Sequence, residues 1–265
     1  MITRDIITSR ANPFVKRLRA LVDDSARSGL AVLEGAKLVG EALAAGLEIV
    51  ECAATPDTAD GAQAALVARI AEGGATVRLL TPAVLAAVSP AETAQGLLAV
   101  ARRPAFDEER IFRGTPLIVA GVAIQNPGNA GALLRAAEAA GATGAFFTAG
   151  SADTMSWKAL RGSMGSAFRV PHVTGIAVGD LMSRLEARGV RAIAAAAAGG
   201  DPYDAMDFTG PVAFLLGNEG AGLPEELARG AGRRVAIPMA GAVESLNVAV
   251  AAGVLLFEAA RQRRR

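Results

Sequence analysis

Short apolar runs alternate with stretches of helical apolar spacing along the first hundred residues. Residues 12–27 place Phe14, Leu18, Leu21 and Val22 at i, i+4, i+7 and i+8, which predicts an amphipathic helix. The other predicted helices are 36–45, 62–71 and 82–88, and the predicted strands are 30–33, 48–53, 76–80 and 96–101. Such alternation is typical of an α/β fold with helices packed on a sheet.

A second α/β series follows after residues 103–114, which contain a proline and a cluster of charges but show no period. The predicted strands are 117–124, 144–148, 170–174, 190–197 and 211–216, and the predicted helices are 129–140, 156–162, 179–188 and 244–263. We therefore expect an N-terminal domain over 1–102, a linker over 103–114 and a C-terminal domain over 115–265.

Two of these elements carry particular expectations. The alanine run in 190–197 favours a helix by propensity, but its position after Arg188-Gly189 favours a strand. The last helix is apolar nearly all round through 249–257, so we expect it to be buried on several sides, by the core or by a second subunit.

Composition supports a large folded core and limits the charge available for nucleic-acid binding. Hydrophobic residues make up 52% of the 265 residues, and 27 Lys+Arg against 26 Asp+Glu leave a net charge of +1. Basic residues cluster locally, at Arg10, Lys16, Arg17 and Arg19 and in the C-terminal run 261–265. Each cluster can be a solvated helix face or a contact for phosphates.

The residue inventory excludes several kinds of chemistry. The chain has one cysteine, Cys52, and one histidine, His172, so an internal disulfide, a multi-cysteine zinc site and a histidine metal cluster are all excluded. Cys52 lies in an apolar run and is predicted to be a buried small hydrophobe. We see no signal-peptide pattern and no apolar run of about 20 residues, and we expect a cytoplasmic protein with no membrane segment.

Three glycine-rich turns join apolar strands to helices, at 126–131, 217–222 and 237–247. Glycine lets bare backbone approach a ligand, so the three turns predict a small-molecule pocket built from loops. The first turn does not fit dinucleotide binding, because Gly128 and Gly131 lack the required glycine spacing and the next strand has no acidic residue at its end.

Polar residues in these turns have both structural and chemical interpretations. Arg135 can pair with Glu138 at i+3, or its guanidinium can grip a phosphate. Ser245 and Asn247 can cap a helix start. Glu219 stands among glycines, where it is exposed.

The three pieces, in this order, resemble the SpoU/TrmH family of RNA 2′-O-ribose methyltransferases. The matching stretches are Asn129-x-Gly-x-x-x-Arg135, Leu216-Gly-Asn-Glu-Gly220, and Ile237-Pro-Met with Ser245-Leu-Asn-Val-Ala-Val-Ala251. The N-terminal part, with 33–37 and 41–43, is similar to the small substrate-binding domain that precedes the catalytic domain in such proteins. The resemblance implies a parallel sheet threaded into a trefoil knot, an S-adenosylmethionine pocket in that knot, no metal, and a homodimer through the C-terminal domain.

The resemblance also implies roles for single residues. The catalytic residues would be Asn129, Arg135, Glu219, Ser245 and Asn247. The methyl donor would be bound by Leu216, Gly217, Ile237, Met239, Ser245 and Leu246. RNA would be bound by Arg10, Lys16, Arg17 and Arg19 of the N-terminal domain.

An arginine essentially never loses its proton in a protein. Arg135 is therefore expected to hold a phosphate and the nascent alkoxide, and Glu219 is the better proton acceptor. The likeness is greatest to members that act on large-subunit ribosomal RNA, including the thiostrepton-resistance type. A tRNA 2′-O-methyltransferase and a non-catalytic RNA-binding protein with the same fold remain alternatives.

Overall fold

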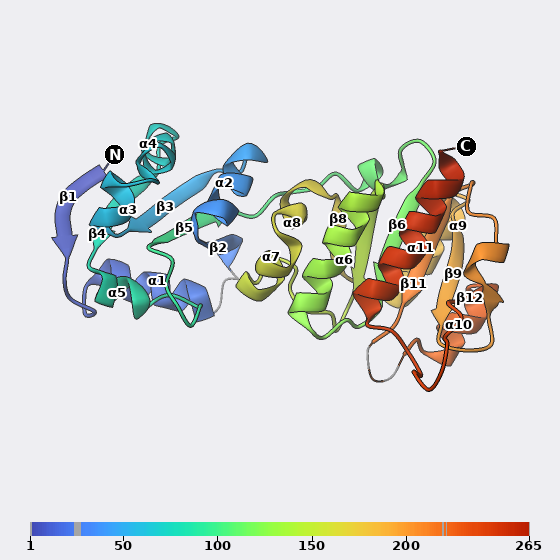
Figure 1. The fold of residues 1–265 in the computed structure, drawn as a ribbon. Helices are drawn as coiled ribbons and strands as arrows, with labels where there is room; N and C mark the ends of the chain where they lie inside the picture. The colour runs from blue at the N-terminus through green and yellow to red at the C-terminus, as the bar shows by residue number, and fades with distance from the viewer. Residues whose placement is uncertain (1, 24–27, 219, 221, 265) are drawn as a thin grey trace. The chain divides into compact units, whose positions relative to one another are not determined.

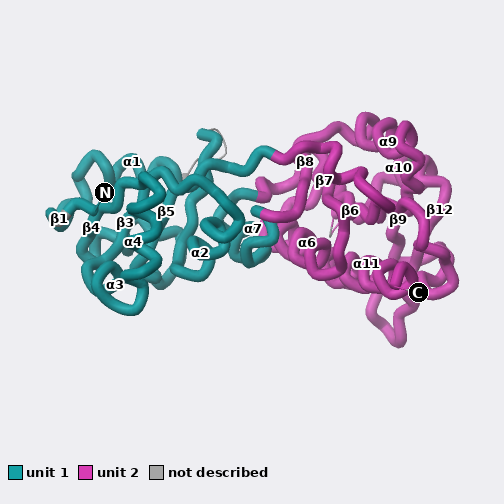
Figure 2. Tube along the Cα trace, turned by 90° about the horizontal axis from the view of Figure 1, so that it is seen from above, with its two compact units in different colours: residues 1–105, 155–168 teal, residues 106–154, 169–265 magenta. Residues whose placement is uncertain are grey.

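The computed structural model describes residues 2–23, 28–218, 220 and 222–264. They fold into two compact units, each with its own sheet (Figure 2). The first unit comprises residues 1–105 and 155–168, and the second comprises residues 106–154 and 169–265. Figure 1 labels the helices and strands in chain order.

The first unit is built on a five-stranded mixed sheet in the order β1-β4-β3-β5-β2. Its elements are β1 (Ile2–Ile7), α1 (Pro13–Asp23), β2 (Leu30–Glu34), α2 (Ala36–Ala44), β3 (Ile49–Ala54), α3 (Pro56–Asp60), α4 (Ala64–Glu72), β4 (Thr76–Leu80), α5 (Pro82–Ala86) and β5 (Leu97–Arg102). Strand β5 runs antiparallel to both β2 and β3, and the remaining pairs are parallel.

The predicted apolar stripe of α1 lies in the core of this unit. Phe14 and Leu18 are buried and pack in one cluster with Leu80 of β4 and Leu98 of β5. Cys52 is buried in β3, and burial raises the pKa of its thiol to about 12. At neutral pH the thiol is therefore protonated, and it serves as a small hydrophobe, as predicted.

One segment of the first unit comes from much later in the chain. Helix α7 (Trp157–Ser163) packs against β2, and α8 (Ser166–Arg169) follows it, with its first three residues in the first unit and Arg169 in the second. Its position in the chain predicts that this stretch belongs to the C-terminal domain, 115–265. Apolar periodicity predicts that a helix forms, but it does not say which sheet the helix covers.

The second unit is built on seven strands in the order β10-β12-β9-β11-β6-β7-β8, all paired in parallel. Its elements are η2 (Glu108–Phe112), β6 (Leu117–Gly121), α6 (Pro127–Ala140), β7 (Gly144–Thr148), β8 (His172–Ile176), α9 (Val178–Ala187), β9 (Arg191–Ala196), β10 (Asp201–Pro202), η3 (Tyr203–Ala205), β11 (Val212–Leu216), α10 (Glu225–Gly230), β12 (Arg233–Ala236) and α11 (Val248–Arg263).

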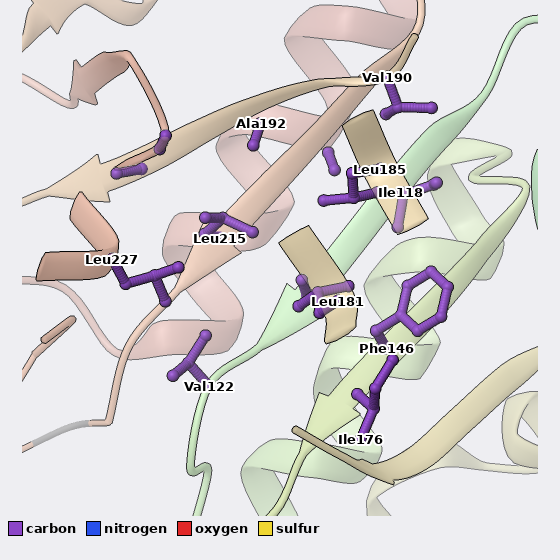
Figure 3. Packing of buried hydrophobic residues seen from close by; sticks show 14 of the residues in the cluster. Ile118, Val122, Phe146, Ile176, Leu181, Leu185, Val190, Ala192, Leu215 and Leu227 are labelled. Atoms are coloured by element: carbon purple, nitrogen blue, oxygen red, sulfur yellow. The ribbon is translucent and has the colours of Figure 1, made fainter. Parts of the chain in front are cut away.

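Helices cover both faces of the parallel sheet, with α6 and α11 on one side and α9 and α10 on the other (Figure 2). Residues of β6, β7 and β11 are therefore all buried, as expected for parallel strands covered on both faces. On the α9 side, Leu181 and Leu185 pack against Ile118, Phe146 and Leu215 from three neighbouring strands (Figure 3).

The structure settles the conformation of residues 190–197 and corrects the start of the last helix. The 190–197 run is a strand, β9, rather than a helix. The last helix begins at Val248 and not at Glu244, because the Asn247 side chain caps it there. The core of this chain covers only part of the helix, since Val250 and Phe257 are 52% and 47% exposed, and burial by a second subunit stays a prediction.

The C-terminal arginines are largely engaged within the second unit. Arg261 makes two hydrogen bonds of 2.7 Å to Glu258. Arg263 donates to the carbonyl oxygens of Thr115, Pro116, Phe208 and Gly210, and its partial burial lowers the pKa of its guanidinium. These two arginines of the C-terminal run therefore stabilise the second unit.

His172 is a structural residue. It is buried, its Nε2 lies 3.0 Å from the Thr154 hydroxyl, and its Nδ1 lies 2.9 Å from the Val170 carbonyl oxygen. Burial lowers the pKa of the imidazole, so the ring is neutral at neutral pH. Both ring nitrogens are occupied, which argues against an acid–base role.

Candidate functional site

A cavity of about 540 Å³ lies at the carboxyl ends of three neighbouring strands of the second unit. Its walls are the end of β9 at 195–197, the loop that follows β11, and the segment from β12 to the start of α11. Ligands of open parallel sheets bind at this edge, outside the carboxyl ends of the strands. We call this space the strand-end cavity.

The loop after β11, residues 217–223, folds back on itself as far as it is described. Gly222 N donates to Asn218 O at 2.8 Å, and Gly220 N donates to Asn218 Oδ1 at 2.9 Å. A Cβ atom on Gly217 would lie 2.2 Å from the carbonyl carbon of Gly222. Position 217 therefore requires glycine, and the loop presents bare backbone to the cavity, as the sequence predicted.

All six residues expected to bind a methyl donor line the strand-end cavity. They are Leu216, Gly217, Ile237, Met239, Ser245 and Leu246. Ser245 does not cap the last helix, because it lies two residues before the N-cap Asn247, in an exposed loop. The cavity brings these residues together, while their role in binding remains a prediction.

The lining carries no charged side chain among the residues that the structure describes. Backbone groups, aliphatic side chains, one serine and two asparagines supply the contacts. Within the described ranges, no group of three or more His, Cys, Asp and Glu could hold a metal ion. The described walls can therefore hold a ligand by shape and by backbone hydrogen bonds.

Two predicted catalytic asparagines meet beside the cavity. Asn247 Nδ2 donates to Asn129 Oδ1 at 3.1 Å. Asn247 Oδ1 also caps α11 by accepting from the backbone N–H groups of Ala249 and Val250 at 2.9 and 3.4 Å. Asn126 caps α6 in the same way, accepting from Gly128 and Asn129. The starts of two helices are thus tied together at the mouth of the site.

Arg135 lies on α6, two turns after Asn129, and is exposed. It makes no hydrogen bond or ion pair with the described part of the chain. The pair with Glu138 that the sequence allowed is absent, since Glu138 binds Arg169, with Nη2 3.0 Å from Oε2. The guanidinium is therefore available to an external anion. Glu219, the predicted proton acceptor, lies outside the described residues.

Sequence reasoning missed the contacts that connect the loop after β11 with the loop after β6. Asn218 Nδ2 donates to Ala123 O at 2.9 Å, and Val122 N donates to Leu216 O at 2.8 Å. Ala123 has a positive φ of 51° and is held there by a 2.9 Å bond from its N–H to Thr148 Oγ1. Asn218 lies within the second glycine-rich turn, and this position is the feature of the sequence that could have indicated its role in the contact.

The predicted RNA-binding residues lie on or just before α1, and all four are exposed. Arg17 forms an ion pair with Glu51, and Arg19 donates to the Ala87 carbonyl at 2.7 Å. The side chains of Arg10 and Lys16 make no hydrogen bond or ion pair within the described ranges. Arg10 and Lys16 are therefore the cations of this group whose side chains are most available to a phosphate.

We predict that replacing Asn247 by alanine lowers both the stability and the activity of the protein. The variant loses the helix cap, which contributes about 1 kcal/mol, and the bond to Asn129. Asn247→Ser should keep the cap but not the bridge, so its stability should stay near that of the parent while its activity falls. Thermal denaturation measures the contribution of the helix cap, and an activity assay measures the contribution of the bond to Asn129. A fully active Asn247→Ser variant would show that the bridge is dispensable.

Two family descriptions match this chain. The SpoU rRNA methylase family matches residues 116–257, and an MRM3-like substrate-binding domain matches residues 12–99. The first match contains the strand-end cavity, Asn129 and Arg135. The second covers most of the first sheet and helix α1.

None of the described helices is long and apolar enough to cross a membrane.

Similar proteins agree with these matches. An uncharacterised tRNA/rRNA methyltransferase of Synechocystis sp. is 33% identical over 99% of this chain and 96% of its own length. The 23S rRNA (guanosine(2553)-2′-O)-methyltransferase of Bacillus subtilis is 34% identical over 70% of this chain and 73% of its own length. The crystal structure of an AdoMet-bound rRNA methyltransferase from Sinorhizobium meliloti has a TM-score of 0.83 and 32% identity, covering 98% of each chain.

Proposed function

The chain belongs to the SpoU rRNA methylase family, and from this premise we propose that it methylates a ribose 2′-hydroxyl of ribosomal RNA. The methyl donor is S-adenosylmethionine. One observation carries the proposal: a strand-end cavity built from the glycine loop adjoins the Asn247–Asn129 pair and the α6 helix that bears Arg135. Large-subunit RNA is the favoured substrate, because a 23S rRNA methyltransferase is among the relatives.

The strand-end cavity suits this methyl donor. Its volume of about 540 Å³ lies within the range of about 300–1,000 Å³ typical of small-molecule sites. The aliphatic side chains of Leu216, Ile237 and Leu246 can enclose the flat adenine, and the backbone of the 217–223 loop can satisfy its polar edge. When bound, S-adenosylmethionine supplies an electrophilic methyl group on a sulfonium.

The reaction needs little acid–base chemistry. The ribose 2′-oxygen would accept the methyl group that the bound donor supplies, and the ribose hydroxyl would lose its proton. Arg135 holds the adjacent phosphate and stabilises the alkoxide as it forms. Asn129, Asn247 and Ser245 orient the ribose. Glu219 is the proposed acceptor of the proton.

Labelled methyl transfer tests the proposal. Protein, tritiated S-adenosylmethionine and bulk RNA are incubated with a chelator present, since no metal is expected to take part. Label should enter large-subunit ribosomal RNA at a ribose 2′-oxygen. Label in transfer RNA alone would favour the tRNA alternative. Methyl-donor and RNA binding without transfer to either RNA would indicate a non-catalytic RNA-binding protein.

We propose that the domain over 1–102 recognises RNA through the exposed cations on and just before α1. Replacing both Arg10 and Lys16 by glutamine should weaken RNA binding and reduce the slope of log K against log salt by about 1.4–1.8, if both contact phosphates. An Arg69→Gln/Arg229→Gln variant removes two exposed arginines elsewhere and should leave the slope unchanged. Equal slopes for the two double variants would remove Arg10 and Lys16 from the RNA interface.

We propose that the protein is a homodimer through the C-terminal domain. The exposed Val250 and Phe257 support this, because they lie two helical turns apart on one side of α11. A Val250→Glu/Phe257→Glu variant should sediment as a monomer at concentrations where the parent sediments as a dimer. An unchanged sedimentation coefficient would rule out this face as the interface. Circular dichroism would confirm that the variant is folded.

The knot and the cellular location are further parts of the proposal. After β12, at one side of the parallel sheet, the chain returns across β9 and β11 to place α11 against α6 and β6. We propose that this return is threaded as the trefoil knot that the family resemblance implies.

We place the protein in the cytoplasm, together with the ribosomal RNA that it would modify.

A further inference from the structure

A second polar pocket lies within the first unit, away from every residue used so far. It has a volume of about 590 Å³ and lies between the loop at 90–95 and helix α7. Trp157, Lys158 and Arg161 form the α7 side, and Glu92, Thr93 and Gln95 contribute to the loop side. Trp157 is the only tryptophan in the chain. We call this space the Trp157 pocket.

The indole of Trp157 is flanked by two cations. Lys158 Nζ lies 5.9 Å and Arg161 Cζ lies 5.6 Å from its ring centroid. Both distances fall within the roughly 6 Å reach of a cation–π contact, so the two cations lie beside an indole that is itself half-buried. Lys158 and Arg161 are exposed, and neither forms an ion pair or hydrogen bond with the described residues.

The facing loop is fixed by hydrogen bonds to Glu34 at the end of β2. The Ser89 hydroxyl donates to Glu34 Oε1 at 2.6 Å, and Gln95 N donates to the same oxygen at 3.3 Å. Gly35 allows Gln95 to lie close, since a Cβ there would be 2.0 Å from Gln95 Oε1. Glu92 is the acidic residue among those that line the pocket. The loop wall is thus preformed.

We propose that the Trp157 pocket is a single-stranded RNA subsite that takes one unpaired base on the indole, with the flanking phosphates on Lys158 and Arg161. An aromatic face with adjacent cations is the arrangement that binds single strands, because bases stack on the ring and cations hold the backbone. A duplex keeps its bases stacked within the helix and cannot use the ring. The inference rests on the proposed function only in taking RNA as the substrate.

The single tryptophan makes the pocket directly measurable in the full-length protein. A single-stranded 12-nucleotide oligoadenosine should quench Trp157 fluorescence, and the same strand annealed to oligouridine should quench it much less. Lys158→Gln/Arg161→Gln should weaken the quenching titration and reduce its salt slope by about 1.4, since each phosphate contact contributes about 0.7 on single strands. Arg69→Gln, which removes an exposed last-turn helix arginine like Arg161, should change neither.

Variants of Trp157 are followed by the anisotropy of a labelled oligoadenosine. Trp157→Leu should bind about five- to a hundredfold more weakly, the range for loss of one stacked base. Trp157→Phe should stay within a few-fold of the parent, and this outcome also shows that the pocket remains folded. Equal affinity of the leucine and phenylalanine variants would overturn the stacking role.

Three further results would overturn the proposal: equal quenching by the duplex, by inorganic pyrophosphate, or by an acidic peptide. The last would assign the pocket to a protein partner instead. The test is independent of methyl transfer. Quenching without methylation leaves the pocket in place and rejects the proposed function, whereas methylation without quenching rejects the pocket alone.

Discussion

Arg135→Ala is expected to lower methyl transfer by about a thousandfold or more while the affinity for S-adenosylmethionine stays within about threefold. Arg135 is exposed on α6, has no partner among the described residues, and is absent from the lining of the strand-end cavity. Its removal is therefore expected to leave the proposed methyl-donor site intact. The loss falls on the step in which negative charge develops on the ribose oxygen. Single-turnover kinetics and calorimetry measure the two quantities separately.

Arg135→Lys sharpens this prediction. A lysine supplies a point charge but not the planar fork that grips two oxygens, so the variant should remain close to the alanine variant in rate. Arg229 offers a matched control, because it is another exposed helix arginine of the same unit. Arg229→Ala should keep normal turnover. Near-normal turnover by Arg135→Lys would mean that charge alone suffices.

Two strands have the bounds that the sequence predicted, and one of them, β7, is a continuous apolar run between turn residues. The predicted bounds of β4 (Thr76–Leu80) and β7 (Gly144–Thr148) agree with the structure. In β7 every residue is buried, so its pattern is a single apolar block that admits few alternatives.

Elements with a weak or mixed pattern were missed. Strand β12 has the sequence Arg-Arg-Val-Ala, and two of its four residues are charged. Strand β1 and helix α10 were not predicted either. Their place in the fold depends on partners distant in sequence, as in the pairing of β12 with β9. Local propensity contains no information about such pairings.

The candidate site was predictable only in part for the same reason. The glycine-rich turns identified the residues from 216 to 247 that line the cavity. They did not identify the β9 wall at 195–197, whose alanines carry no chemical signal. Nor did they show that Asn218 would bond to Ala123, a residue 95 positions earlier.

Gly217→Ala is expected to abolish measurable binding of S-adenosylmethionine, with a loss of affinity of about a hundredfold or more. The added Cβ would lie 2.2 Å from Gly222 C, 2.3 Å from Leu223 N and 2.4 Å from Gly222 O. All three are backbone atoms, so no side-chain rotation can relieve the contact. The 217–223 loop must move away from β11, and the wall of the strand-end cavity moves with it.

The same displacement should reach the ribose side of the site. Asn218 follows Gly217 directly and holds the Ala123 carbonyl, so a shift of the loop disturbs the turn that leads into α6. Methyl transfer should therefore fall further than methyl-donor affinity alone explains, even at saturating donor. Gly179→Ala is the matched control, because a Cβ there meets nothing within 4 Å, and both its binding and its turnover should match the parent. Donor affinity within a few-fold of the parent in Gly217→Ala would show that this loop does not form the methyl-donor site.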